Sequence, residues 1–196
     1  IVVGAMDTNL SPDLQSLHDQ LDAAERDAHA LVAGLTQEQG IWQPQVGSWS
    51  IAECLDHIAT GNHVYLAAMQ EPAARARARG QFRSRRVKPG LIGHLFARSF
   101  EPPPAWWSRR KAPRKIRPRA ERSLAEAFAD LVASQGNLRA FLIAQADLDL
   151  TSIRFPNPFV RGIRFSIATG LYVITAHQRR HLWQAWQVRR RLERAG

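Results

Sequence analysis

The sequence contains a single cysteine, Cys54, and no long apolar run. One thiol excludes an internal disulfide and any C-x-x-C motif. Because no run approaches the roughly 20 apolar residues of a membrane span, we expect a soluble protein with no membrane partner. The chain also shows no charged-then-apolar leader, so the expected compartment is a reducing cytoplasm of the bacterial type.

Acidic residues are almost absent between residues 75 and 119, where Glu101 is the only one. The same segment contains fifteen cations: Arg75, Arg77, Arg79, Arg83, Arg85, Arg86, Lys88, Arg98, Arg109, Arg110, Lys111, Arg114, Lys115, Arg117 and Arg119. Fifteen cations against one acid give this segment a charge of +14, whereas the whole chain carries +10. The remainder of the chain is therefore mildly acidic.

The length of 196 residues suits one well-filled core rather than two. We therefore expect a single domain over residues 8–196. Residues 75–119 form its basic insertion, which contains proline and tryptophan and shows no sustained period apart from a short helix near residues 91–100. Residues 147–164 are predicted to be a loop with a short extended piece.

A serine precedes each of four regions in which apolar residues recur at the helical period. Ser11 begins a first helix of about twenty residues, and Ser50 begins a second, with Glu53 completing a capping box. Ser123 and Ser166 begin the third and fourth helices. The sequence therefore predicts an all-α fold, a four-helix bundle with the long basic insertion between its second and third helices.

Two histidines, His177 and His181, lie on the apolar side of the fourth expected helix. At about 100° per residue they fall about 40° apart, and they share that side with Gly170, Val173, Ile174, Ala185, Val188 and Leu192. A buried imidazole without a partner costs roughly 1–3 kcal/mol for each unsatisfied nitrogen. The pair is therefore either hydrogen-bonded within the core or part of a divalent-metal site.

A third histidine, His57, lies at the edge of the apolar face of the second helix and can reach the interior. His63 points to the polar side together with Asp56 and cannot. Glu53, one turn before His57, is a candidate to orient that imidazole as a carboxylate behind a metal ligand, although its capping role alone explains it. Gln135, at the centre of the apolar stripe of the third helix, is a weaker candidate of the same kind, and a hydrogen-bonded structural glutamine is the simpler interpretation.

Two segments resemble motifs of the DinB/YfiT-like superfamily, a set of bacterial four-helix-bundle proteins. Residues 47–58, GSWSIAECLDHI, are similar to its W-S-[I/L]-x-[E/Q]-x-x-x-H-[I/L] segment. Residues 177–184, HQRRHLWQ, are similar to its H-x-x-[H/R]-H-x-x-Q segment. The resemblance extends over nearly the whole chain except residues 75–119.

This resemblance implies an up-down-down-up bundle and frequently a homodimer. It also implies a divalent-metal site made by His57, His177 and His181. Characterised relatives include transferases and isomerases that use bacillithiol or mycothiol, so a low-molecular-weight thiol is an expected partner.

Three neutral imidazoles leave a divalent ion with an open position, as in catalytic rather than structural zinc sites. Such a site can lower the pKa of a water or thiol at that position. The sequence offers no serine–histidine–aspartate constellation and no glycine-rich phosphate loop, so any chemistry depends on the metal. We expect a metal-dependent thiol S-transferase or hydrolase, with zinc favoured and nickel or ferrous iron as alternatives.

A competing interpretation is a protein that binds nucleic acid or another anionic partner through residues 75–119. Cations interleaved with Trp106 and Trp107 could contact phosphates and stack on bases. Arg109, Arg110 and Lys111 are the candidate anion-binding residues. The alternatives for the segment are a solvated loop that adds solubility and a basic entrance to an active site for an acidic small molecule.

The fourth helix carries a second apolar face, away from its histidines. It consists of Ala168, Leu171, Tyr172, Thr175, Leu182, Trp183 and Trp186. An exposed strip of this kind usually marks an interface. The sequence therefore predicts either a twofold homodimer through this face or an insertion that folds back over it with Phe96, Phe100, Trp106 and Trp107.

Overall fold

The computed structural model describes residues 10–103, 112–119 and 121–195. The three predicted anion-binding residues, Arg109, Arg110 and Lys111, lie outside these described residues, as do Trp106 and Trp107.

The described chain is mostly helical, as the sequence predicts. Its long helices are α1 (Pro12–Val32), α3 (Ile51–Ala78), α5 (Leu124–Ala144) and α6 (Ile167–Ala195). Its shorter elements are α2 (Gln37–Ile41), α4 (Leu91–Arg98), the 3₁₀ turn η2 (Arg114–Ile116) and the antiparallel strands β1 (Arg154–Pro156) and β2 (Arg164–Ser166). No helix in the described ranges is both long and apolar enough to cross a membrane.

Local hydrogen bonds account for where the long helices begin. Ser50 and Ser123 each form a capping box, with Glu53 and Glu126 respectively. At α6 the hydroxyl of Ser166 accepts from the backbone N–H of Thr169 at 3.1 Å. The prediction of a hydroxyl cap at α1 is wrong. Ser11 makes no side-chain cap bond, and its hydroxyl accepts from Arg83 of the insertion instead.

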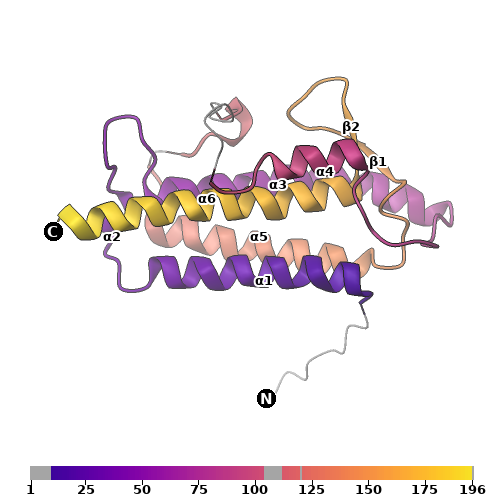
Figure 1. Ribbon diagram of the computed structural model, residues 1–196, viewed down its shortest axis with the longest axis horizontal. Helices are drawn as coiled ribbons and strands as arrows, with labels where there is room; N and C mark the ends of the chain where they lie inside the picture. Colours follow the sequence, from indigo (N-terminus) through magenta and orange to yellow (C-terminus); the bar gives the residue numbers. More distant parts are fainter. Residues whose placement is uncertain (1–9, 104–111, 120, 196) are drawn as a thin grey trace, which may run out of the picture.

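Four long helices lie side by side in the molecule (Figure 1). α1 and α6 run in one direction and α3 and α5 in the other, so the amino terminus of α1 and the carboxyl terminus of α6 are at opposite ends. α1 and α3 each pack against both α5 and α6. Two separate clusters of buried apolar side chains fill the space between them.

A layer of polar side chains lies between these two apolar clusters. It consists of Asn62, Ser134, Gln135 and Gln178, each no more than 1% exposed. Gln178 and Gln135 exchange two amide hydrogen bonds, of 3.0 and 3.1 Å. Gln178 also donates to Asn62 Oδ1 at 3.0 Å, and Asn62 donates to Ser134 Oγ at 2.9 Å. Every amide therefore has a partner, and the layer joins α3, α5 and α6.

Most of the second apolar face of α6 is buried within the chain, and Tyr172, Trp183 and Trp186 are half-buried, so it is not the exposed strip that the sequence predicts. Leu171 and Leu182 are each 2% exposed, and the indole N–H of Trp186 donates to Asp27 of α1 at 2.9 Å. At the other end α4 packs so closely on α6 that Gly93 leaves no room for a side chain against Thr169. A homodimer stays a prediction of the family resemblance, without support from this face.

The insertion packs on the bundle in the parts that the structure describes. Phe96 and Phe100 contact the larger apolar cluster, which is the fold-back that the sequence allowed as an alternative. Among the described residues of the insertion, five cations pair with acids, all of which lie outside it: Arg75–Glu71, Arg77–Asp147, Arg83–Asp13, Arg85–Asp149, and Arg119 with Asp56 and Asp130. Part of the basic charge is thus neutralised by the body of the protein.

Replacing Gln178 by leucine tests the buried polar layer. The change leaves the amides of Gln135 and Asn62 each short of a partner in a dry environment, so we expect a loss of about 2–3 kcal/mol in the free energy of unfolding. Chemical denaturation measures it. Gln187→Leu, the same change at a half-buried position of α6, should alter that free energy by no more than about 0.5 kcal/mol. Equal losses in both variants would contradict a special role for the layer.

Candidate metal centre

The structure brings together the three histidines that the sequence singled out. His57 of α3 and His177 and His181 of α6 offer nitrogen atoms that all lie within 4.8 Å of one another. The Nε2 atoms of His57 and His177 are 3.0 Å apart, and the ring centroids of His57 and His181 are 4.3 Å apart.

Helix geometry and a glycine make this approach possible. His177 and His181 are four residues apart and so project from the same side of α6. On α3, Gly61 lies one turn after His57 and faces the ring of His177. A Cβ atom at Gly61 would lie 3.3 Å from His177 Cε1, tighter than ordinary van der Waals contact. Gly61 therefore leaves the space that the imidazole of His177 occupies.

Hydrogen bonds fix which nitrogen of two rings carries a proton. His57 Nδ1 lies 2.5 Å from the carbonyl oxygen of Ile116, and His181 Nδ1 lies 3.0 Å from Oε1 of Gln184. A carbonyl oxygen only accepts, so each Nδ1 carries the proton and donates it. The Nε2 atoms of His57 and His181 are then left with lone pairs, which is the state that metal ligation requires.

The separation of the ring nitrogens fits a divalent ion. Nitrogen ligands at about 2.0–2.1 Å in tetrahedral geometry are about 3.3 Å from one another. The observed 3.0 Å between the Nε2 atoms of His57 and His177 is close to that value. Without a metal, a proton on His177 Nε2 that His57 Nε2 accepts would satisfy the same contact, and a metal would replace that proton. The donor set and its spacing therefore suit a metal.

Aromatic side chains surround the histidines and limit their contact with water. The ring of Trp49 lies 4.7 Å from that of His57 and 5.6 Å from that of His181. Phe100, from the insertion, lies 6.0 Å from the ring of His177. His57 is 2% exposed and His181 9% exposed, whereas His177 keeps partial contact with solvent.

Burial lowers the pKa of all three imidazoles. It lowers the pKa of His57 to about 4, against the opposing effects of the Ile116 carbonyl and the Asp56 carboxylate. For His177 and His181 burial, and then the neighbouring histidines, hold the pKa well below its usual value. Arg180 adds to the lowering at all three positions. The imidazoles are therefore neutral at physiological pH and available as ligands.

The two other candidate residues have different partners. The Glu53 carboxylate accepts from the backbone N–H of Ser50 and from Gln43 Nε2, both at 2.8 Å. The orienting group at His57 Nδ1 is instead the backbone carbonyl of Ile116. Gln135 belongs to the buried polar layer, where it bonds Gln178, the residue that follows His177.

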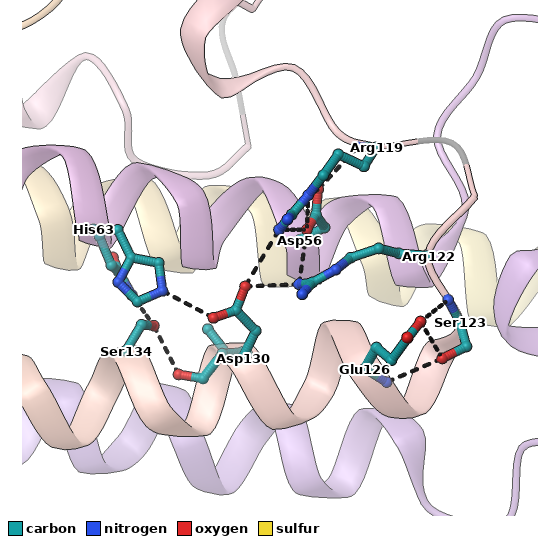
Figure 2. Close-up of polar contacts among 10 residues, drawn as sticks. Asp56, His63, Arg119, Arg122, Ser123, Glu126, Asp130 and Ser134 are labelled. Carbon is teal, nitrogen blue, oxygen red and sulfur yellow. Dashed lines mark hydrogen bonds and ion pairs between the residues drawn. The ribbon is translucent and has the colours of Figure 1, made fainter.

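A cluster of charged side chains joins the end of the insertion to α3 and α5, through Asp56, the neighbour of His57 in the sequence, and Asp130 (Figure 2). Asp56 accepts from the backbone N–H of Arg119 at 2.9 Å and from its guanidinium at 2.6 Å. Arg122 bridges Asp56 and Asp130, at 3.1 and 2.6 Å, and His63 contacts Asp130 at 2.9 Å. This cluster fixes Arg119, three residues after the carbonyl that orients His57.

The prediction that Asp56 lies on the polar side of its helix is wrong, because its side chain is completely buried. Two arginines balance its charge there and a backbone N–H donates a hydrogen bond to it, so the buried carboxylate does not depend on contact with water. Sequence reasoning missed both this cluster and Ile116. The sequence could have indicated this cluster only through Asp56, the acid next to His57. Its partners, Arg119 and Arg122, lie more than sixty residues away in the chain.

The lowered histidine pKa values predict that the metal-free protein loses stability in mild acid. Below about pH 6.5 the unfolded chain binds protons that the folded chain does not, so the free energy of unfolding falls with pH. The loss at about pH 5.5 should be about 1 kcal/mol for each histidine. Urea unfolding of chelator-treated protein at neutral pH and at about pH 5.5 measures it.

His177→Gln should remove about a third of this pH dependence, whereas His94→Gln, at an exposed position of α4, should leave it unchanged. A free energy of unfolding that does not vary over this range would contradict the assignment.

Comparison with known proteins identifies the family. The family model described as the DinB superfamily matches residues 20–185, which include all three histidines. No curated protein and no solved structure gives a significant match to this chain. Since the matched region is most of the sequence, the chain belongs to the DinB superfamily.

Proposed function

We propose that this protein is a divalent-metal-dependent enzyme of the transferase or hydrolase type, in which His57, His177 and His181 hold the metal. The observation that carries the proposal is the convergence of three neutral imidazoles, two of them with Nδ1 tied to a carbonyl oxygen and Nε2 left as a ligand. Membership of the DinB superfamily supports it. Zinc is favoured, and nickel or ferrous iron also suit imidazole ligands.

A divalent ion held by three histidines supplies a Lewis acid with an open position, which lowers the pKa of a water or thiol there. The protein itself orients the imidazoles and excludes water. Ile116 and Gln184 keep two imidazoles in the required tautomer and orientation. Trp49 and Phe100 exclude bulk water, which strengthens electrostatic interactions at the centre. Hydrophobic walls of this kind favour a nucleophile that is easily desolvated, and a low-molecular-weight thiol fits that description.

A cation close to the centre favours a negatively charged substrate or thiolate. Arg180 is near enough to all three histidines to lower their pKa, and its own pKa is lowered by burial. Arg180 also interacts with another group of the protein, so what it contributes at the centre is a positive field rather than an unoccupied guanidinium. We propose that the second substrate is an acidic small molecule or the thiolate itself.

We further propose that residues 8–196 form one domain, an up-down-down-up four-helix bundle with residues 75–119 as its insertion. The directions of α1, α3, α5 and α6 and their mutual packing support this arrangement. Contacts of Phe96, Phe100 and Arg119 with the body of the protein support a single folding unit.

Metal analysis tests the site directly. Protein purified without a polyhistidine tag should contain about one divalent ion per chain. Variants His57→Ala, His177→Ala and His181→Ala should each lose most of it, because two imidazoles alone bind weakly. His94→Ala is the matched control, since His94 is an exposed histidine of α4 outside the group of three. A metal-free wild type, or a triple alanine variant that retains the ion, would remove the site and the proposed function with it.

The charged cluster beside His57 yields a second test. Asp56→Asn should loosen Arg119 and with it the Ile116 carbonyl, and so weaken metal affinity by about tenfold, as for other groups that orient metal ligands. Competition with a chromogenic chelator measures the affinity. Asp147→Asn removes a comparable carboxylate that pairs with Arg77, remote from residues 116–119, and should leave affinity unchanged. Equal affinities in wild type and Asp56→Asn would show that the cluster does not orient His57.

A further inference from the structure

A pocket of about 890 Å³ lies away from the histidines, on the later part of α3. Its walls come from three places: α3, the residues at η2, and the β1–β2 hairpin, whose connecting loop projects from the bundle (Figure 1). The volume is within the range of about 300–1,000 Å³ that is usual for small-molecule sites. None of the three histidines lines it.

The lining of this pocket is strongly cationic. It contains Arg75, Arg114, Lys115, Arg161 and Arg164. The only acid among the described lining residues is Glu71, and it pairs with Arg75. The other four cationic side chains have no carboxylate partner in the lining. They are exposed and border the same pocket, so an anionic ligand between them would be stabilised.

Apolar side chains form another part of the same lining. Pro72, Pro156, Phe159 and Ile163 are among them. The ring of Phe159 packs against that of Tyr65, with centroids 5.4 Å apart. An apolar surface beside a cationic rim suits a ligand that has an apolar body and a charged head.

Hydrogen bonds hold the walls in place. The side chain of Asn157, only 7% exposed, accepts from the backbone N–H groups of Phe159 and Val160 at 2.8 and 3.0 Å. Arg164 donates to the carbonyl of Arg154 at 3.1 Å. Lys115 reaches the carbonyl of Pro158 at 3.5 Å and so joins the η2 wall to the hairpin. Hydrogen bonds therefore connect the segments that carry these cations, so the walls of the pocket are held in place before a ligand binds.

We propose that this pocket binds a small organic phosphate or a similar organic anion, with its charged head among Arg114, Arg161 and Arg164 and its apolar body against Phe159. A guanidinium group can donate two parallel hydrogen bonds to two phosphate oxygens, so we expect these arginines to bind a phosphate more tightly than a monoanion. None of the three histidines lines the site, and Ala67, the first α3 residue in its lining, is ten residues after His57, or about 15 Å along the helix axis. The η2 wall is nearer to the metal centre, because Lys115 directly precedes Ile116, whose carbonyl contacts His57.

Binding of 2-naphthyl phosphate tests the proposal, with 2-naphthol as the uncharged ligand of the same shape. Fluorescence titration of the full chain at about 50 mM salt should show saturable binding of the phosphate. The naphthol should bind at least about tenfold more weakly. Arg161→Gln and Arg114→Gln should each weaken phosphate binding by about tenfold. Arg98→Gln, an exposed arginine of the insertion outside the lining, should change it less than about twofold.

Several results would overturn the proposal. Equal losses in the Arg98 and Arg161 variants would mean diffuse attraction by surface charge, and equal affinity for naphthol would mean that the cations take no part. Loss of binding in His177→Ala would place the phosphate at the histidines. Displacement by single-stranded oligonucleotides with an affinity that rises with their length would favour nucleic acid. Unchanged binding in His177→Ala supports a separate site whether or not the histidines hold a metal.

Discussion

A buried polar group needs a partner, and this constraint governs the interior of the protein. Two apolar clusters could fill the space between four helices without any polar atom. Instead the chain buries the imidazoles of His57 and His181, a carboxylate at Asp56 and a layer of amides. Each is satisfied through a contact with a distant part of the sequence, so the polar groups determine which segments must meet. Between the Nε2 atoms of His57 and His177, either a proton on His177 that His57 accepts or a shared cation satisfies both rings.

The long helices could be predicted from the sequence because they depend on local periodicity, whereas the group of three histidines was implied by the family resemblance, with which the periodicity agrees. Apolar residues repeat at helical spacing along α1, α3, α5 and α6, and serine caps mark most of their starts. Two histidines four residues apart share a side of any helix, so His177 and His181 needed no tertiary information. His57 followed from its position on the edge of an apolar face.

Tertiary contacts are what sequence periodicity could not supply. Asp56 sits at an angular position that reads as polar, but the end of the insertion covers it and two arginines neutralise it. The partner of His57 Nδ1 is a backbone carbonyl. Because every residue has one, the residue types cannot indicate which carbonyl it is. The apolar second face of α6 suggested another subunit because nothing in the sequence says that α1 and α4 cover it. In each case the missing fact was which remote segment lies alongside.

The amide layer has a geometric consequence for the histidines. Gln178 directly follows His177 on α6, and Asn62 lies five residues after His57 on α3. A slip of α6 by one turn relative to α3 would move the two amides about 5.4 Å apart along the axis and break their bond. Apolar side chains tolerate such a shift far better than paired amides, because their contacts have no direction. The layer therefore sets the axial register of the two helices, and with it the height at which His57 meets His177.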